Sequence, residues 1–246
     1  IAVTMNEAVY NATGGSGALA VSDFALTLSG GAATLSSATP SSISASGNVY
    51  TLGMSISGTP TGYEQITVTP VDNSIYDATD NEASTSQLMN QDYLFDKAGP
   101  AISSAGSIGI NNSTIAVTFN EMVYNTNSGS GALEASDFAF ALSGGTATAA
   151  AVSSIAVSGY TYTLGITLTG IANGSETLTV TPVANSIYDA NGNAASTTQS
   201  NNTATLLDGR IAIITSFEHD GQYGQENSII RIDSDTYLLA YKGNGG

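Results

Sequence analysis

Two loops of the sequence carry closely spaced carboxylate and amide side chains, which could bind a hard cation. In one of them, oxygen-bearing side chains alternate with other residues at Asp189, Asn191 and Asn193. The first half of an EF-hand loop uses this spacing to wrap Ca²⁺. The loop departs from an EF-hand at its sixth and twelfth positions, where the glycine and the glutamate are missing. A calcium site here therefore needs ligands from elsewhere in the chain, for which Glu121 and Asp137 are candidates.

The other loop carries more negative charge at the corresponding place. Its oxygen-bearing residues are Asp77, Thr79, Asp80, Asn81 and Glu82, with Asp72 close by in the sequence. A higher ligand charge favours tighter binding of Ca²⁺. Glu7 and Glu121 occupy equivalent positions upstream of the two loops and are further candidates. The predicted metal ligands are thus Glu7, Asp77, Asp80, Asn81, Glu121, Asp189, Asn191 and Asn193.

Each of these side chains also has a purely structural interpretation. Asp and Asn cap turns and tolerate left-handed backbone conformations, so both loops could be turns without a metal. Glu7 and Glu121 could accept hydrogen bonds from backbone N–H groups of a nearby loop. Asp23 and Asp137 follow a serine in the motif SDF, which favours a turn or a helix N-cap over a ligand role.

Groups suited to catalysis are scarce. The chain has no cysteine and a single histidine, His219. Disulfides, thiolate sites, cysteine nucleophiles and multi-histidine metal sites within one chain are therefore excluded. His219 lies between Glu218 and Asp220, but the sequence identifies no nucleophile or oxyanion site to accompany it. We expect a loop histidine and no enzyme activity.

The charge of the chain excludes further classes of function. Twenty acidic residues against four basic ones give a net charge of -16. Such a chain is repelled by phosphate backbones and by anionic lipid, and no apolar run approaches the roughly 20 residues of a membrane span. Nucleic-acid binding and membrane insertion are therefore not expected. Lys97 is the one basic residue in 1–207, so the carboxylates there must be solvated, cap turns or be neutralised by cations.

The sequence contains a long internal repeat. Residues 1–31 match 115–145 at most positions, and after a gap 66–87 match 178–199. The period of about 112 residues is the size of one β-sandwich domain. Stretches such as IAVTF and LTVTPV alternate or run apolar, and Gly-, Asn- and Ser-rich turns separate them. The fold class expected is all-β, with tandem antiparallel Ig-like β-sandwiches.

The repeat predicts domain boundaries at 1–96 and 97–208, followed by a partial β domain at 209–246. A linker at 96–100 and a strand at 101–110 precede the second copy, whereas nothing equivalent precedes Ile1. The first domain is thus expected to lack its first strand, because the chain is a fragment or because a neighbouring subunit supplies that strand. In the last segment, two apolar stretches flank a polar turn at 233–235, which predicts a hairpin.

Two motifs in each repeat resemble those of a protein family. FNEMVYN at 119–125 and MNEAVYN at 5–11 end a strand, and SIYDANGNAAS at 186–196 and SIYDATDNEAS at 74–84 form a later loop. This pattern resembles bacterial Ig-like domains of surface-layer proteins and giant adhesins. The linker DKAGP is similar to the junctions of that family, although Asp80 replaces the expected glycine. The tail 226–246 resembles more weakly the start of a β-propeller repeat.

The resemblance implies display on the bacterial cell surface, tandem repetition and no catalysis. The function expected is that of structural or adhesive spacer modules in a large extracellular protein, forming a stalk or filament. A cation at Asp96 or Asp208 would stiffen the domain junctions; otherwise these charges are solvated. The partners expected are neighbouring domains of the same polypeptide, with a glycan or cell-surface ligand bound by other domains. Two alternatives are a filament or surface-layer subunit that self-associates by strand donation, and accessory modules of a secreted glycan-active enzyme.

Overall fold

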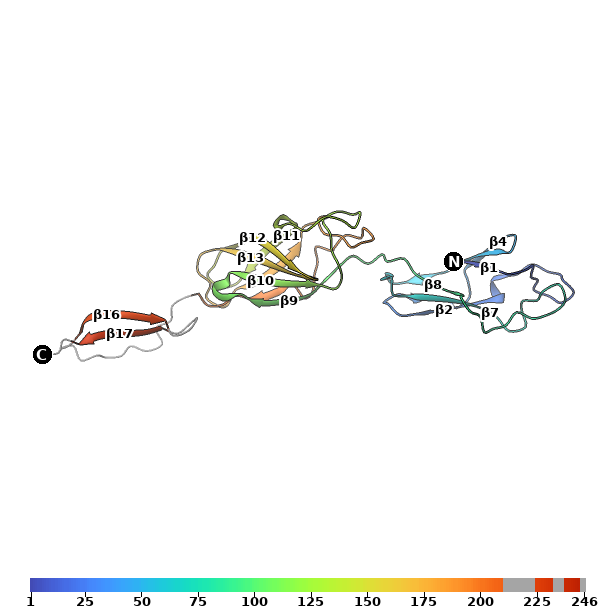
Figure 1. Cartoon of the computed structure of the whole chain (residues 1–246), viewed down its shortest axis with the longest axis horizontal. Helices are drawn as coiled ribbons and strands as arrows, with labels where there is room; N and C mark the ends of the chain where they lie inside the picture. The colour runs from blue at the N-terminus through green and yellow to red at the C-terminus, as the bar shows by residue number, and fades with distance from the viewer. Residues whose placement is uncertain (210–223, 232–236, 244–246) are drawn as a thin grey trace. The chain divides into compact units, whose positions relative to one another are not determined.

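The structure of the protein, a computed structural model, describes residues 1–209 and the backbone of 224–231 and 237–243. In these ranges, turns and loops join antiparallel β-strands, with isolated 3-10 turns and no α-helix. The prediction of an all-β protein is confirmed. The chain divides into two compact units, Ile1–Ala98 and Gly99–Gly246 (Figure 1).

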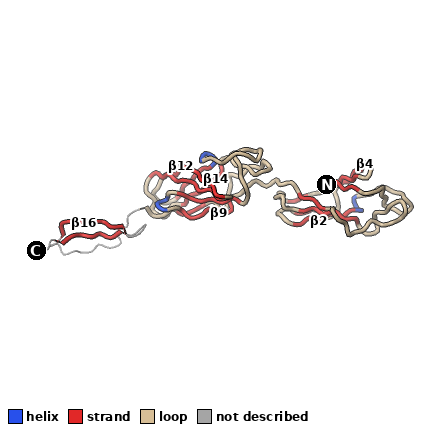
Figure 2. Tube along the Cα trace, in the orientation of Figure 1, coloured by secondary structure: helices blue, strands red, loops and turns tan. Residues whose placement is uncertain are grey.

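The second unit builds its core between two antiparallel sheets. The larger sheet has the strand order β12 (Ala149–Ser158), β13 (Thr161–Thr169), β10 (Thr114–Phe119) and β9 (Ile102–Ile108). The smaller sheet has the order β11 (Phe138–Ser143), β14 (Thr177–Pro182) and β15 (Thr203–Thr205). Figure 2 shows these strands in red, with long tan loops between them.

Alternation of apolar and polar residues explains which side of each strand faces this core. Burial alternates along β10, so Ile115, Val117 and Phe119 are almost fully buried while their neighbours are not. The inward side chains of β11, β13 and β14 join them in one cluster. At one end, the ring of Phe119 meets that of Tyr162 edge to face, with centroids 5.8 Å apart.

The first unit repeats this plan with shorter strands. One sheet has the order β1 (Ala2–Thr4), β5 (Val49–Gly53) and β4 (Ser42–Ser46). Another has the order β2 (Phe24–Ser29), β7 (Gln65–Pro70) and β8 (Gln91–Tyr93), and a small pair consists of β3 (Thr34–Leu35) and β6 (Ile56–Ser57). Side chains from both three-stranded sheets form the core, among them Leu26, Leu52, Ile66 and Val68.

The long hairpin β12–β13 of the second unit corresponds to broken strands in the first. From Ala33 to Ser42 the chain is two residues longer than from Ala147 to Ser154, and the insertion includes the buried Pro40. Proline has no backbone N–H to contribute to a strand ladder. The first unit therefore has β3 and β4 where the second has the continuous β12.

The two units also differ at one sheet edge. In the second unit, β9 pairs with β10 and also contacts β15 of the other sheet. In the first unit, β1 pairs with β5 only and is the edge strand of its sheet. Within the described residues, no strand of the first unit pairs with β1 on the side that β9 takes beside β10.

The predicted hairpin near the end of the chain is present in the structure. β16 (Gly224–Arg231) pairs antiparallel with β17 (Tyr237–Gly243), and Ile230 lies opposite Leu238. The polar turn predicted at 233–235 lies outside the described residues. In the part of the chain that the structure describes, no helix is long and apolar enough to cross a membrane.

Candidate functional site

The acidic loop of the second unit is organised by Asp189. This side chain is fully buried, and its Oδ1 accepts hydrogen bonds from the backbone N–H groups of Asn191 and Asn193, both at 2.8 Å. Its Oδ2 accepts a bond from the Asn193 side-chain amide at 2.7 Å. The loop is therefore a tight turn closed around a carboxylate.

Glu121 lies beside this loop, as the sequence interpretation requires of an additional ligand. An isolated bridge between Tyr124 and Tyr188 holds the segment after β10 against the loop after β14. The partly buried Glu121 and the buried Asp189 each place a carboxylate oxygen within 4.8 Å of the other. Carboxylates this close form a group that could hold a metal ion, and a hard cation would offset their mutual repulsion.

The acidic loop of the first unit has a similar turn at Asp77. The Oδ1 of Asp77 accepts bonds from the backbone N–H groups of Thr79 and Asn81, and its Oδ2 accepts a bond from the Asn81 side-chain amide. These bonds, led by that from the Asn81 side chain, lower the pKa of Asp77 to about 2. Asp77 is therefore ionised at every pH above strong acid.

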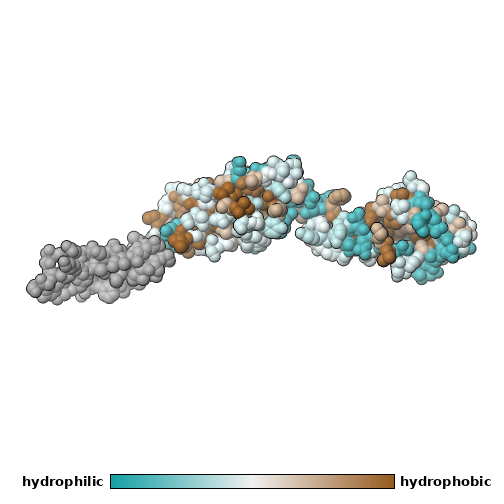
Figure 3. Space-filling model, viewed as in Figure 1, coloured by the Kyte–Doolittle hydropathy of each residue, from teal (hydrophilic) through white to brown (hydrophobic). Residues whose placement is uncertain are grey.

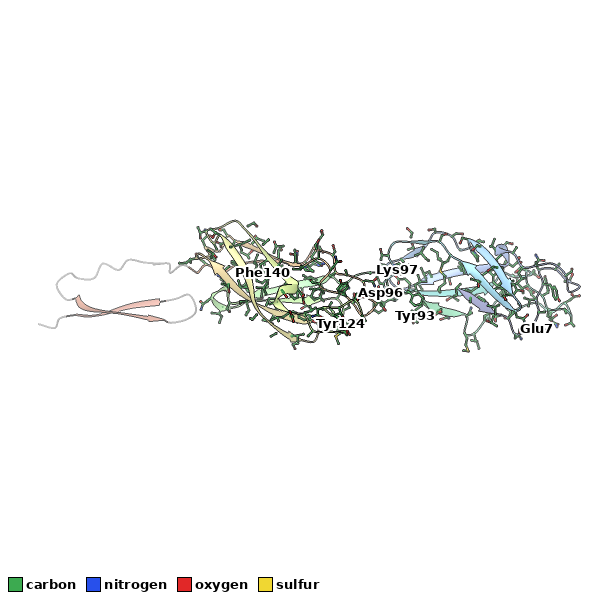
Figure 4. All side chains as sticks on the ribbon, turned by 90° about the horizontal axis from the view of Figure 1, so that it is seen from above. Glu7, Tyr93, Asp96, Lys97, Tyr124 and Phe140 are labelled. Atoms are coloured by element: carbon green, nitrogen blue, oxygen red, sulfur yellow. The ribbon has the colours of Figure 1, made fainter. Side chains whose placement is uncertain are left out.

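Asp80 and Glu7 are placed differently from the sequence expectation of one ligand set. Asp80 adopts a left-handed backbone conformation, with φ of 70°, where the second unit has Gly192 with φ of 84°. Its carboxylate accepts a hydrogen bond from the Gly14 backbone N–H and so joins two loops. Glu7 is exposed, and it lies at the opposite end of the first unit from Asp96 (Figure 4). Within the described first unit taken by itself, no three acidic side chains place carboxylate oxygens within 4.8 Å of one another.

The remaining acidic candidates have structural contacts. Asp23 and Asp137 end the 3-10 turns η1 (Val21–Asp23) and η3 (Ala135–Asp137), and each accepts a bond at 2.7 Å from the backbone N–H three residues earlier. Each aspartate thus caps its turn from the third residue of that turn, and not from the N-cap position that precedes the turn. Burial raises the pKa of Asp137. Asp96 accepts a bond from the Ala98 backbone N–H at 2.9 Å, and Asp208 takes part in an isolated bridge to Asn173.

Sequence reasoning missed two buried carboxylates with many hydrogen bonds, Glu64 and Glu176. Both are fully buried and stand at equivalent positions just before β7 and β14. Glu64 accepts bonds from the backbone N–H groups of Ala32 at 2.7 Å, Ala33 at 2.9 Å and Thr61 at 2.8 Å. Each glutamate thus fastens a turn after one strand to the start of another.

Glu176 makes the same contacts in the second unit. It accepts bonds from the backbone N–H groups of Thr146 at 2.6 Å, Ala147 at 3.1 Å and Asn173 at 2.9 Å. We call this arrangement of a buried glutamate and three backbone donors the glutamate clamp. Burial opposes the charge of Glu64 and Glu176, but the backbone hydrogen bonds outweigh it and lower the pKa of each to about 2.

A glycine leaves room for each clamp. A Cβ on Gly31 would lie 2.0 Å from Oε1 of Glu64, and one on Gly145 would lie equally close to Glu176. Both glycines also have positive φ, of 58° and 64°. The signal was present in the sequence. In both copies, a glutamate stands about 30 residues after SGG, immediately before an apolar strand. A lone buried glutamate, however, is not expected from residue type alone.

Two further results bear on function. His219, for which the sequence predicts a loop position, lies outside the described residues. Comparisons with protein-family models, with curated proteins and with solved structures gave no match to the chain.

Proposed function

We propose that the chain consists of structural spacer modules of a large bacterial cell-surface protein, which together form part of a stalk or filament. The observation that carries the proposal is the duplication of one β unit together with its glutamate clamp. The clamps at Glu64 and Glu176 use carboxylates for internal fastening. Within the described residues, every buried side-chain nitrogen or oxygen has a hydrogen-bond partner. A spacer needs such internally satisfied units, because it transmits force and does not turn over a substrate.

The proposed architecture is a row of Ig-like sandwiches. Two sheets with a shared core and a repeat period of about 112 residues support this assignment. The motifs around Glu7 and Glu121, and the later loops at 74–84 and 186–196, support the likeness to bacterial surface-layer and adhesin domains.

Ca²⁺ is the ion we propose for the pair of carboxylates at Glu121 and Asp189. Ca²⁺ accepts six to eight oxygen ligands in flexible geometry, which suits a loop rich in Asp and Asn. The amide oxygens of Asn191 and Asn193 would complete the set if the Asn193 side chain turned its oxygen toward the ion. In the structure this amide donates a bond to Asp189 instead.

Single-molecule stretching tests the spacer proposal. We expect two separate unfolding events, each releasing roughly 300 Å of chain, because about 100 residues extend to about 3.5 Å each. Addition of Ca²⁺ should raise the unfolding force of one event only, and Glu121→Gln should abolish that increase. The matched change Glu7→Gln, at an exposed position, should leave it unchanged.

Other outcomes would refute parts of the proposal. Gradual lengthening without discrete events would contradict a role as a load-bearing spacer. Equal forces with Ca²⁺ and with a chelator would remove calcium but leave the spacer role standing. Protease treatment of intact cells of the organism that makes the protein should release its peptides, and their complete protection would exclude surface display.

A further inference from the structure

Three exposed aromatic side chains lie on one sheet of the first unit. Tyr63, Tyr93 and Phe95 are 74%, 61% and 88% exposed. Tyr93 ends β8, Phe95 follows it by two residues, and Tyr63 stands two residues before β7. Figure 4 shows Tyr93 at the end of the first unit that carries Asp96, away from Glu7. We call Tyr63, Tyr93 and Phe95 the aromatic patch.

The register of the sheet places the three residues next to one another. The antiparallel pairing of β7 with β8 continues past the strands themselves, because the backbone N–H of Leu94 donates to the Glu64 carbonyl at 2.9 Å. This register sets Tyr63 opposite Phe95, with Tyr93 two residues away on the same strand. Residues directly opposite each other in an antiparallel pair have Cβ atoms about 4.5–5.5 Å apart. The rings can therefore contact one ligand together.

Alternation along both strands turns the aromatic patch away from the core. Glu64 and Ile66 are fully buried, and Leu94 packs against the core cluster. Since successive side chains of a strand point to opposite faces, the residues between them lie on the outer face of the sheet. Gln65 and Thr67 share this face and add amide and hydroxyl groups beside the rings. Figure 3 shows hydrophobic residues among hydrophilic ones on the surface of the first unit.

The second unit has the same outer face without the aromatic rings. Ser175, Thr205 and Leu207 stand at the three corresponding positions. All three are exposed, although β9 is in place and contacts β15. A strand at the position of β9 therefore does not cover this face. The rings themselves are what distinguishes the first unit from the second.

The glutamate clamp holds the backbone that presents Tyr63. Glu64 accepts hydrogen bonds from the Thr61 backbone N–H at 2.8 Å and from the Thr61 hydroxyl at 3.1 Å. A Cβ on Gly30 would collide with the Tyr63 carbonyl oxygen, so the neighbouring turn packs directly against this backbone. Tyr93 is fixed in turn by its place in the strand ladder. A binding surface on a rigid backbone loses little conformational entropy when a ligand binds.

We propose that the aromatic patch binds a neutral polysaccharide of the cellulose or chitin type. The pyranose rings of such a polymer carry their substituents equatorially, which leaves apolar C–H faces that can stack on aromatic rings. The tyrosine hydroxyls, Gln65 and Thr67 can bond with the sugar hydroxyl groups around those faces. Nucleic-acid bases also stack on exposed aromatic rings, but a chain with a net charge of -16 repels their phosphates. An uncharged, ring-bearing polymer is not repelled.

Calorimetric titration of the 246-residue chain with cellohexaose and with chitohexaose tests the proposal. We expect saturable binding of at least one of them, and the comparison distinguishes a glucan from a chitin-type ligand. Tyr93→Ala should weaken binding by roughly tenfold, because it removes one stacked ring. Tyr93→Phe keeps the ring and should lose less. The control Tyr160→Ala, at an exposed tyrosine of the second unit, should leave binding unchanged.

Three outcomes would overturn the proposal. Absence of saturable binding of both oligosaccharides would refute it and leave the spacer role standing, since that role does not depend on a ligand. Equal weakening by Tyr93→Ala and Tyr160→Ala would place the sugar elsewhere on the chain. Sedimentation equilibrium without sugar gives the third: a native dimer that Tyr93→Ala converts to a monomer would assign the aromatic patch to contact between copies of the chain.

Discussion

The carboxylates of this protein differ in their burial and in the groups that donate hydrogen bonds to them. Glu64 and Glu176 are buried and accept three backbone hydrogen bonds each, whereas Glu7 is exposed. A buried carboxylate is stable as an anion only if such donors replace the water it has lost. In an acidic chain with so few basic residues, backbone N–H groups take the place of counter-ions.

Replacement of Glu64 by alanine should destabilise the first unit. The change leaves buried backbone donors without acceptors, each of which costs about 1–3 kcal/mol. We therefore expect the free energy of unfolding to fall by at least about 1 kcal/mol in urea denaturation. Glu7→Ala is the matched control and should change it little. An equal loss in both variants would mean that the clamp adds no stability.

At the scale of elements, the buried Asn112 fixes the turn between β9 and β10. It lies in the 3-10 turn η2 (Ile110–Asn112), and its amide both donates to the backbone of Leu207 at 2.8 Å and accepts from it at 2.7 Å. The turn is thereby attached to the segment that follows β15. In the first unit Phe95 stands at the position of Leu207 and is 88% exposed.

Asn112→Ala should loosen this end of the second unit. Asn111 and Asn112 both have positive φ, of 60° and 57°, so an alanine at either position meets the same backbone cost. Only Asn112 is buried and bonded to Leu207. We expect Asn112→Ala to destabilise the unit by about 1–3 kcal/mol more than Asn111→Ala in thermal denaturation. A smaller difference would show that the attachment contributes nothing.

The elements themselves were largely predictable from the sequence, and their contacts were not. Alternation in IAVTF and LTVTPV predicts β10 and β14, and both strands are present in the structure. The clamp glutamates escaped notice because most of their partners are backbone groups 29 to 32 residues away, which carry no residue-type signal. Asp189 was named as a candidate ligand, with Glu121 or Asp137 to join it, and the structure brings carboxylate oxygens of Glu121 and Asp189 within 4.8 Å of each other. The metal itself stays a prediction.

On the scale of the whole molecule, both units should lose stability together in acid. The folded-state pKa values of Glu64, Glu176 and Asp77 are lowered to about 2, from an unfolded value near 4. Their contribution is therefore fully present above about pH 4.5 and is lost as the pH falls toward 2. Asp137 acts in the opposite direction, because its raised pKa favours the folded state on protonation.

Urea denaturation between pH 7 and pH 2 measures this dependence. The double variant Glu64→Gln with Glu176→Gln should be less stable than the native chain at pH 7 but should change less between pH 4.5 and pH 2. Parallel curves for the two proteins would show that other groups govern the acid transition.

The glutamate clamps also set how the folded units respond to salt. Each clamp pairs a buried carboxylate with uncharged backbone N–H groups and not with a basic side chain. Exposed charges lose much of their interaction as the screening length shrinks from about 8 Å at physiological salt to about 3 Å at 1 M, whereas buried groups are screened much less. The clamps should therefore hold the turns in brine as firmly as in dilute solution.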